Sequence, residues 1–306
     1  MNDEVISLKK SVNPLLWREV GGEVVKNLLL ILLVIASSCT MQEEESQVRQ
    51  GNSPLIKANQ SGGEQTTLPF TAAVSTALIK KGEYVPLYGS NKGTVSVSDF
   101  EMDVYPVTNK QYAAFVKRFP QWQKSSIKKI FADANYLHSW AGDTTLGESM
   151  TPNASVTNVS WFAAKAYCAC MGKRLPTLDE WEYVAMADET TADARTKKPF
   201  NQYILDWYEK PGTFKNEIGK TYKNYWGVYD THGLVWEWTS DFNSVMISGE
   251  SRNEGKDNAL FCGSGSIGAK DLMNYAALMR YAFRGSLKAN YAVQNLGFRC
   301  VKNSKP

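Results

Sequence analysis

The sequence predicts an α+β domain made of short helices, short strands and long ordered loops. Residues 94–109 alternate apolar and polar side chains, as a half-buried strand does. Two stretches carry the residue pairs that begin helices, while residues 201–300 are rich in Gly, Asn, Tyr and Trp. A hydrophobic content of 43% is enough for a core, so the chain is predicted to fold rather than to stay disordered.

Two helices are expected after the strand. Thr108 and Gln111 have the spacing of a capping box, in which each side chain accepts a backbone N–H at the start of a helix. A second helix is predicted over Trp161–Met171, followed by Gly172, a residue that readily ends a helix in a left-handed conformation. It contains Cys168 and Cys170.

A third helix is expected to begin after Thr177, which forms another capping box with Glu180, and to run to about Ala187. Beyond it, residues 201–300 are expected to form short strands and long ordered loops without further helices.

The N-terminal region has the pattern of an export signal. Residues 28–36 read LLLILLVIA, which is shorter than the roughly 20 residues needed to span a bilayer. Small residues follow and end at Cys39, as in a bacterial lipobox, so a signal peptide and lipidation of Cys39 are expected. A buried apolar strand or helix is the alternative for this segment.

The organisation that follows has three parts. Residues 1–39 are the signal and lipobox segment, and residues 40–76 have the polar composition of a flexible tether. One folded domain is expected over residues 77–306. The expected location is therefore the bacterial cell envelope, with a lipid anchor in a membrane.

Charge and histidine content exclude two classes of function. The 34 basic and 31 acidic residues nearly balance at +3, so nucleic acid is not an expected partner. The two histidines, His138 and His232, argue against a metal centre built from several histidines.

Four phrases in this order carry a family resemblance: YPVTNKQYAAFV, NVSWFAAKAYCACMGKRLPTLDEWEYVA, NYWGVYDTHGLVWEWTSD and NLGFRC. Together they resemble the formylglycine-generating enzyme family, also called sulfatase-modifying factor domains, over residues 77–301. The resemblance implies a C-type-lectin-like fold, an α+β class with little regular secondary structure.

The resemblance also implies that the oxidase chemistry is absent. Active members use two cysteines that bind copper and activate oxygen, since soft thiolates select Cu(I). The matching interval, Gly263–Arg299, has no cysteine, and counting back from the closing GFRC places the two positions on Asp271 and Ala276. Cys262 lies just before the interval. Copper is therefore not expected, and the protein is expected to be a pseudoenzyme.

The remaining cysteines are expected to belong to the scaffold. Cys168 and Cys300 match two positions that form a structural disulfide in the family. Cys170 is expected to be a small buried hydrophobe facing the core. A Cys-x-Cys pair on a helix is a poor metal clamp, because residues i and i+2 point about 200° apart.

Two further sites are candidates, the first of them through the resemblance. Calcium is bound in many members near the phrase that here reads GLVWE, so Glu237 is a candidate for weak calcium binding, although Leu234 replaces an expected asparagine ligand. A binding cleft is expected to contain His232, Trp236, Arg280 and Arg284, which could offer an aromatic wall and cationic donors. Arginines of this kind, Arg174 and Arg299 included, alternatively donate to backbone carbonyls.

Three functions remain open at this point. The first is a non-catalytic binding or maturation factor, as in exported relatives associated with copper nitrite reductases. The second is a structural component of an envelope assembly, such as gliding or secretion machinery. The third is an active formylglycine-generating oxidase. The expected partner in the first two is another envelope protein.

Overall fold

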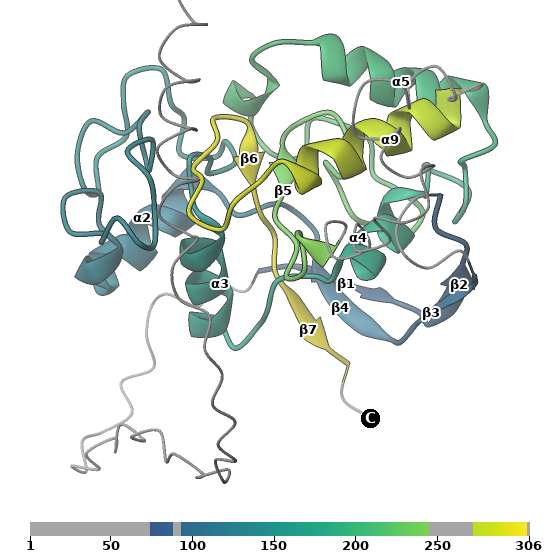
Figure 1. Ribbon diagram of the computed structural model, residues 1–306, viewed down its shortest axis with the longest axis horizontal. Coiled ribbons are helices and arrows are strands. Elements are labelled where there is room, and N and C mark those ends of the chain that lie inside the picture. The colour runs from purple at the N-terminus through teal and green to yellow at the C-terminus, as the bar shows by residue number, and fades with distance from the viewer. Residues whose placement is uncertain (1–73, 88–92, 245–271, 305–306) are drawn as a thin grey trace, which may run out of the picture. The chain divides into compact units, whose positions relative to one another are not determined.

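In a computed structural model of the chain, a three-stranded antiparallel sheet joins both ends of the described sequence (Figure 1). The structure describes residues 74–87, 93–244 and 272–304, which all belong to one unit, Gln65–Pro306. The predictions for residues 1–73, and those for Cys262 and Asp271, lie outside the described residues. No helix in the described ranges is long and apolar enough to cross a membrane.

The three-stranded sheet has the order β1-β4-β7. Strand β4 (Phe100–Asp103) pairs on one side with β1 (Thr76–Ile79) and on the other with β7 (Val301–Asn303). Met102 lies opposite both Ala77 and Val301, and its side chain is buried. The last residues of the domain are thus held against its first ones.

The strand predicted over residues 94–109 is two strands in two sheets. β3 (Val95–Val97) pairs with β2 (Gly82–Tyr84) in a separate two-stranded sheet, and β4 follows after a break at Ser98–Asp99. Residues 104–107 then continue without strand structure toward the first helix. The alternating pattern identified the type of structure but could not show this change of sheet.

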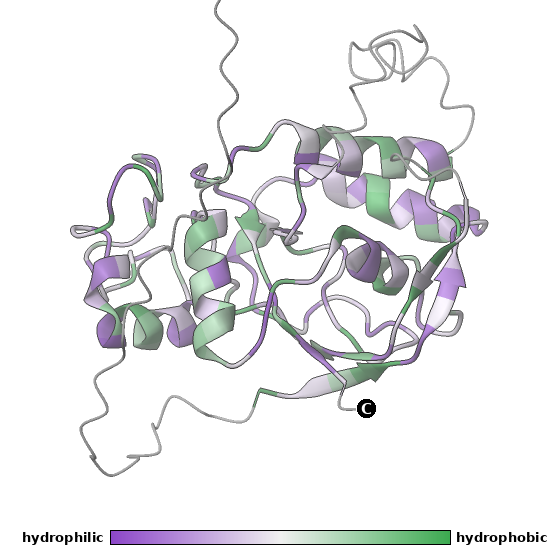
Figure 2. Ribbon diagram, turned by 60° about the horizontal axis from the view of Figure 1, so that its bottom comes forward, coloured by the Kyte–Doolittle hydropathy of each residue, from purple (hydrophilic) through white to green (hydrophobic). Residues whose placement is uncertain are grey.

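The three predicted helices are present. Helix α2 (Asn109–Arg118) begins at the Thr108–Gln111 capping box, and α4 (Leu178–Ala185) begins at the Thr177–Glu180 capping box. α3 (Trp161–Cys170) has Ser160 as its N-cap and is followed by Gly172 at a φ of 66°. Figure 2 shows α3 mostly in hydrophobic colours, because its buried side packs into the main core with α2.

Two helices contradict the expectation for residues 201–300. α5 (Lys198–Glu209) and α9 (Leu272–Gly285) contact each other and cover the part of the domain beside α4 (Figure 1). In α5, Phe200, Ile204 and Leu205 recur at helical spacing and are buried together. The prediction of loops was wrong because aromatic content was weighed above this spacing.

The remaining regular elements are short. Two 3₁₀ helices, η3 (Pro120–Trp122) and η4 (Thr213–Lys215), turn the chain after α2 and α5. β5 (Trp236–Glu237) and β6 (Leu296–Gly297) form a parallel two-stranded sheet. A Cβ on Gly297 would lie 2.6 Å from the carbonyl oxygen of Val156, so the closing phrase requires glycine there. The fold is mixed α+β with modest regular structure.

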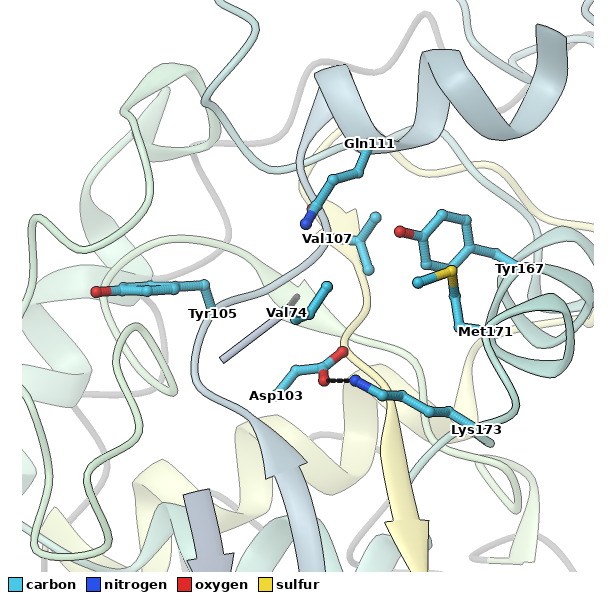
Figure 3. Close-up of a pocket in the computed structure, with 8 residues that line it drawn as sticks. All are labelled: Val74, Asp103, Tyr105, Val107, Gln111, Tyr167, Met171 and Lys173. Carbon is cyan, nitrogen blue, oxygen red and sulfur yellow. Dashed lines mark hydrogen bonds and ion pairs between the residues drawn. The ribbon is translucent and has the colours of Figure 1, made fainter. Parts of the chain in front are cut away.

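A disulfide connects Cys168 on α3 to Cys300, with their Cα atoms 5.5 Å apart, as the resemblance implies. Cys170 is exposed, so its predicted burial was wrong. The reason is the helix geometry itself: with Cys168 turned inward, a residue two positions later must point outward. Beside the disulfide, Lys173 pairs with Asp103 at the edge of a space of about 10 Å³, which has room for no more than one water (Figure 3).

Candidate functional site

Two buried ion clusters lie at the centre of the region where a binding cleft was expected. The first joins Glu237 of β5 to Arg299, and both side chains have no exposed surface. Arg299 donates to both carboxylate oxygens, from Nε at 2.8 and 3.0 Å and from Nη2 at 2.7 Å. Its other N–H groups reach the carbonyls of Asp103, Val104 and Tyr229.

This first cluster gives Glu237 a structural role. The indole N–H of Trp181 donates to Oε2 at 2.8 Å, so four donor contacts surround the carboxylate. The residue nominated for calcium thus already has a guanidinium as its counter-ion. Among the described residues no group of three or more His, Cys, Asp or Glu side chains could hold a metal ion.

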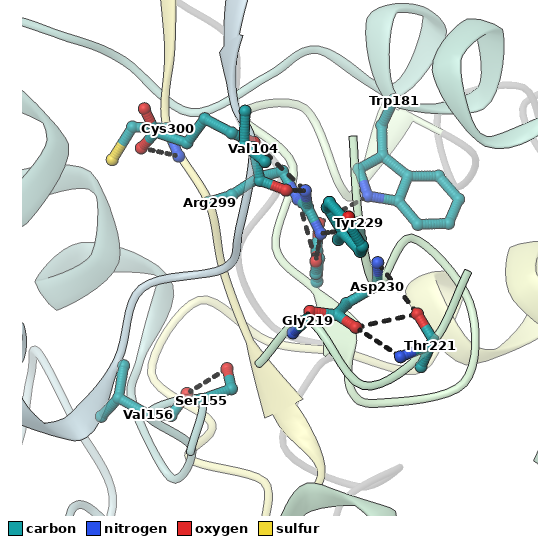
Figure 4. A network of polar contacts seen from close by, with 12 residues as sticks. Val104, Ser155, Val156, Trp181, Gly219, Thr221, Tyr229, Asp230, Arg299 and Cys300 are labelled. Atoms are coloured by element: carbon teal, nitrogen blue, oxygen red, sulfur yellow. Dashed lines mark hydrogen bonds and ion pairs between the residues drawn. The ribbon is translucent and has the colours of Figure 1, made fainter. Parts of the chain in front are cut away.

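Asp230 organises the loop beside this cluster, and the sequence analysis did not single it out. Its buried carboxylate accepts from the backbone N–H groups of Gly219 and Thr221 and from the Thr221 hydroxyl, while its own φ is 61°. Figure 4 shows the carboxylate of Asp230 directed to Gly219 and Thr221, beside the contacts of Arg299. The sequence signal that could have indicated this role is the acidic Asp230 two residues before His232, in a turn that contains Gly233.

The second cluster is built on Glu182 of α4, next to Trp181. Arg280 of α9 donates from Nε to both oxygens of Glu182 and from Nη2 to Oε2 at 2.8 Å. Arg284 donates from Nη1 to Oε1 at 2.6 Å. Burial opposes ionisation of Glu182, but the two guanidinium groups outweigh it and lower its pKa to about 2. Two cations thus share one carboxylate, all three side chains less than a tenth exposed.

One group in this cluster is unsatisfied. Nε of Arg284 is buried and has no hydrogen-bond partner in the described part of the chain. Its guanidinium instead lies over the ring of Trp181, 4.6 Å from the centroid. The arginine pair nominated for a cleft is therefore committed to Glu182 and Trp181.

His232 completes the buried region. Its side chain is not exposed, and Nε2 lies 2.9 Å from the carbonyl oxygen of Ala185, so Nε2 carries the proton. Burial, followed by the charge of Arg280, lowers the pKa of His232 to about 3. The histidine is therefore neutral and packs its ring against the edge of Trp181, with centroids 5.7 Å apart.

Trp236 is the one nominated cleft residue that is partly exposed. It lies between Tyr208 of α5 and Phe283 of α9, with ring centroids 4.8 and 4.6 Å away. The structure thus brings His232, Trp236, Arg280 and Arg284 into one neighbourhood, but not around an open cleft. They form a packed aromatic and ionic core in which three of the four side chains are buried.

An open hollow of about 570 Å³ lies elsewhere, and the sequence analysis missed it. Three parts of the chain line it: Asp133, Asn135 and His138 in the first, Asn158 in the second, and residues 291–294 in the third. Backbone bonds from Asp133 N to Asn290 O and from Asn158 N to Val293 O hold the segments together. Asn158, which lines the hollow, and Leu137, whose neighbour His138 lines it, both have φ near +50°, a conformation that costs free energy in non-glycine residues. No local pattern could predict the hollow, because the segments are about 150 residues apart.

The positions that would bind copper can be tested in part. Ala276 lies on α9 with its methyl group buried beside Phe200, Ile204 and Leu205. A methyl group cannot ligate a metal, so the second sulfur ligand has no counterpart at this position. The described cysteines do not replace it, because Cys168 and Cys300 are bonded to each other and Cys170 is exposed on α3.

Comparisons with known proteins agree with this architecture. The family model for the sulfatase-modifying factor enzyme 1-like domain matches residues 64–304. A formylglycine-generating enzyme of Streptomyces coelicolor is 30% identical over 267 residues, covering 73% of this chain and 84% of the relative. The inactive C-alpha-formylglycine-generating enzyme 2 of Mus musculus is 28% identical and covers 69% and 77%. The solved structure of PvdO from Pseudomonas aeruginosa aligns with a TM-score of 0.43 at 16% identity, over 75% of this chain and 94% of that one.

Proposed function

Because this chain belongs to the family of sulfatase-modifying factor enzyme 1-like domains, we propose that it is a non-catalytic member acting as a binding or maturation factor in the cell envelope. The observation that carries the proposal is the buried methyl group of Ala276 where the oxidase chemistry needs a thiolate. Copper(I) sites depend on soft sulfur ligands. A single cysteine could not both bind copper and exchange with a substrate thiol.

The polar groups nearby support the same proposal. Glu237 and Glu182 are both neutralised by guanidinium groups, and His232 is buried beside Trp181. None of these three has the exposure that a general base needs to reach a substrate proton. A relative named as an inactive formylglycine-generating enzyme shows that the family fold exists without the activity.

Oxidase activity is the alternative, since a relative at 30% identity is named as a formylglycine-generating enzyme. The test incubates the full chain with a sulfatase-motif peptide, copper, oxygen and a reductant, and then measures the peptide by mass spectrometry. We expect the peptide to keep its thiol mass. An aldehyde product that disappears in the Cys262→Ala variant would show that the protein is an oxidase and would overturn the proposal.

We further propose that Cys39 carries a lipid anchor and that the partner is another envelope protein, with a copper nitrite reductase as the first candidate. The hollow beside Asn158 supports a binding role, because it is open, lined by polar side chains and bordered by the half-buried ring of Tyr291. A component of a gliding or secretion assembly is the competing class of partner.

The partner can be identified by cross-linking and affinity capture from the native envelope. The full chain is compared with Tyr291→Ala, which alters the hollow, and with Tyr275→Ala, which removes a similar ring from the exposed side of α9. We expect Tyr291→Ala alone to lose the partner. Equal capture by both variants would remove the hollow from the proposal, and capture of secretion components would select the competing class.

A further inference from the structure

The basic residues of this nearly neutral chain are unevenly placed. Residues 104–132 contain six lysines and arginines, and residues 149–178 contain three more. Neither segment contains Asp or Glu, so all 31 acidic residues lie in the remainder of the chain. These two segments form α2, α3 and their adjoining loops, which occupy the same side of the domain (Figure 1).

Most of these cations are free of counter-ions. Lys173 and Arg174 pair with Asp103 and Glu180. None of the other seven takes part in an ion pair between described residues. The nearest acidic side chains in sequence are already engaged: Asp133 accepts the backbone N–H groups of Asn135 and Ala292, and Asp143 accepts from Ser125.

Exposed apolar side chains lie among these cations. Ile130 is 72% exposed and Phe131 is 38% exposed, directly after Lys128 and Lys129. The ring of Phe131 contacts that of Phe162 on α3, with centroids 5.5 Å apart, and Lys165 lies one turn further along α3. We call this set the basic–aromatic face; it consists of Lys128, Lys129, Ile130, Phe131, Phe162 and Lys165.

This face is anchored firmly in the domain. Phe131 also contacts Trp122 at 5.8 Å, and Trp122 stacks on the buried Phe115 of α2. Phe162 contacts Trp161, over whose ring the ammonium of Lys165 lies at 4.7 Å. The exposed side chains therefore project from a rigid aromatic base.

We propose that the basic–aromatic face docks on an anionic phospholipid surface. Lysines attract anionic headgroups, and aliphatic and aromatic side chains beside them enter the interfacial region of a bilayer. Ile130 distinguishes this occupant from a nucleic acid or another soluble polyanion, since phosphate contacts give no reason for a largely exposed aliphatic side chain.

The N-terminal segment would strengthen such docking. With Cys39 lipidated as proposed, a tether such as the one expected from the composition of residues 40–76 would keep the domain within about 30 Å of the bilayer on average. Weak docking would then act at a high effective concentration. The docking inference itself does not depend on the anchor, and its test is made in chains that cannot be lipidated.

The test measures sedimentation of the full chain carrying Cys39→Ala with vesicles. One set of vesicles mixes phosphatidylglycerol with phosphatidylcholine, and the other contains phosphatidylcholine alone. We expect stronger binding to the anionic vesicles, weakened by salt. Lys128→Glu with Lys129→Glu should reduce the anionic-vesicle partition coefficient by at least about 30-fold, because two attractive charges are lost and two repulsive ones are added. Ile130→Ser should reduce it several-fold without changing the salt dependence.

Matched variants separate the face from general charge and apolarity. Lys220→Glu with Lys223→Glu reverses two exposed lysines elsewhere, and Val85→Ser removes another half-exposed aliphatic side chain; both should bind like the Cys39→Ala parent. Equal binding of the parent to both kinds of vesicle, or equal losses in the two lysine pairs, would overturn the proposal. Binding to heparin without binding to anionic vesicles would assign the face to a soluble polyanion and would also overturn it.

Discussion

Trp181 donates its indole N–H to Oε2 of Glu237 at 2.8 Å, and the same ring lies under the guanidinium of Arg284. One side chain of α4 therefore joins the two buried ion clusters. Because both clusters are out of water, the free energy of each charge depends on its partners being present. Predictions follow for what happens when one partner is removed.

The Glu182 cluster should tolerate the loss of a cation better than the loss of its carboxylate. Glu182→Gln leaves Arg280 and Arg284 buried without a counter-ion and should lower the free energy of unfolding by about 3–5 kcal/mol. Arg284→Met leaves the Glu182–Arg280 ion pair, whose net charge is zero, and should lower the free energy of unfolding by about 2 kcal/mol or less. Urea unfolding measures both, and a larger loss in Arg284→Met would contradict this account.

Acid should destabilise the protein through His232. Its pKa is about 3 in the folded state and 6.5 as a free side chain, so the unfolded state binds the proton first as pH falls. The stability is complete above pH 6.5 and decreases toward pH 3. Between pH 7 and pH 5 this amounts to about 2 kcal/mol.

His232→Gln should remove most of that pH dependence, because glutamine keeps a donor for the Ala185 carbonyl but does not titrate. Urea unfolding at the two pH values is the measurement. Glu182 does not contribute to this pH dependence between pH 7 and pH 5. Its pKa is about 2 in the folded state and 4.5 as a free side chain, so its stabilisation is lost mainly below pH 4.5. An unchanged pH dependence in the variant would count against a neutral His232.

The disulfide should contribute substantially to stability. It closes a loop with a sequence separation of 132, for which loss of chain entropy in the unfolded state gives about 5 kcal/mol. Replacing Cys168 and Cys300 together by Ala should lower the free energy of unfolding by several kcal/mol. Cys170→Ala, on the exposed side of the same helix, is the matched control and should have no effect. Mass mapping of the non-reduced protein should find the Cys168–Cys300 peptide pair.

Removal of calcium should leave the thermal stability unchanged if Glu237 is satisfied by Arg299 and Trp181. The measurement is the Tm of the full chain with added calcium and with a chelator. A rise in Tm with calcium that is lost in Glu237→Gln would restore the calcium site that the resemblance suggested.

The lipid anchor has its own test. Cys39→Ala should release the protein from membranes. Any binding that remains in this variant would come from the basic–aromatic face. Labelling with a radioactive fatty acid should be lost in the same variant. Unchanged labelling would show that Cys39 is not the lipidated residue.

Local signals in the sequence predicted local structure well. The capping boxes at Thr108 and Thr177 are complete in the structure because both partners lie within one helical turn. Apolar spacing in α5 was equally available, and the expectation of loops there overlooked it. The family phrases located the Cys168–Cys300 bond, which spacing alone would not have paired.

The candidate site was predicted only as a neighbourhood. Arg280 and Arg284 lie near His232 and Trp236, but both are buried against Glu182, which lies about 100 residues earlier on α4. The pattern of a helix can show that a residue faces inward, but it does not predict which distant cation that residue contacts. The hollow at Asn158 was missed for the same reason.

The closing residues have a consequence for the order of events in the life of the chain. Arg299, Cys300 and Val301 supply the counter-ion of Glu237, one half of the disulfide and a strand beside β4. All three lie after the other described elements of the domain, so its core cannot be completed until this segment has been synthesised. A chain interrupted before Arg299 would therefore lack the counter-ion, the disulfide and the third strand of the sheet at once.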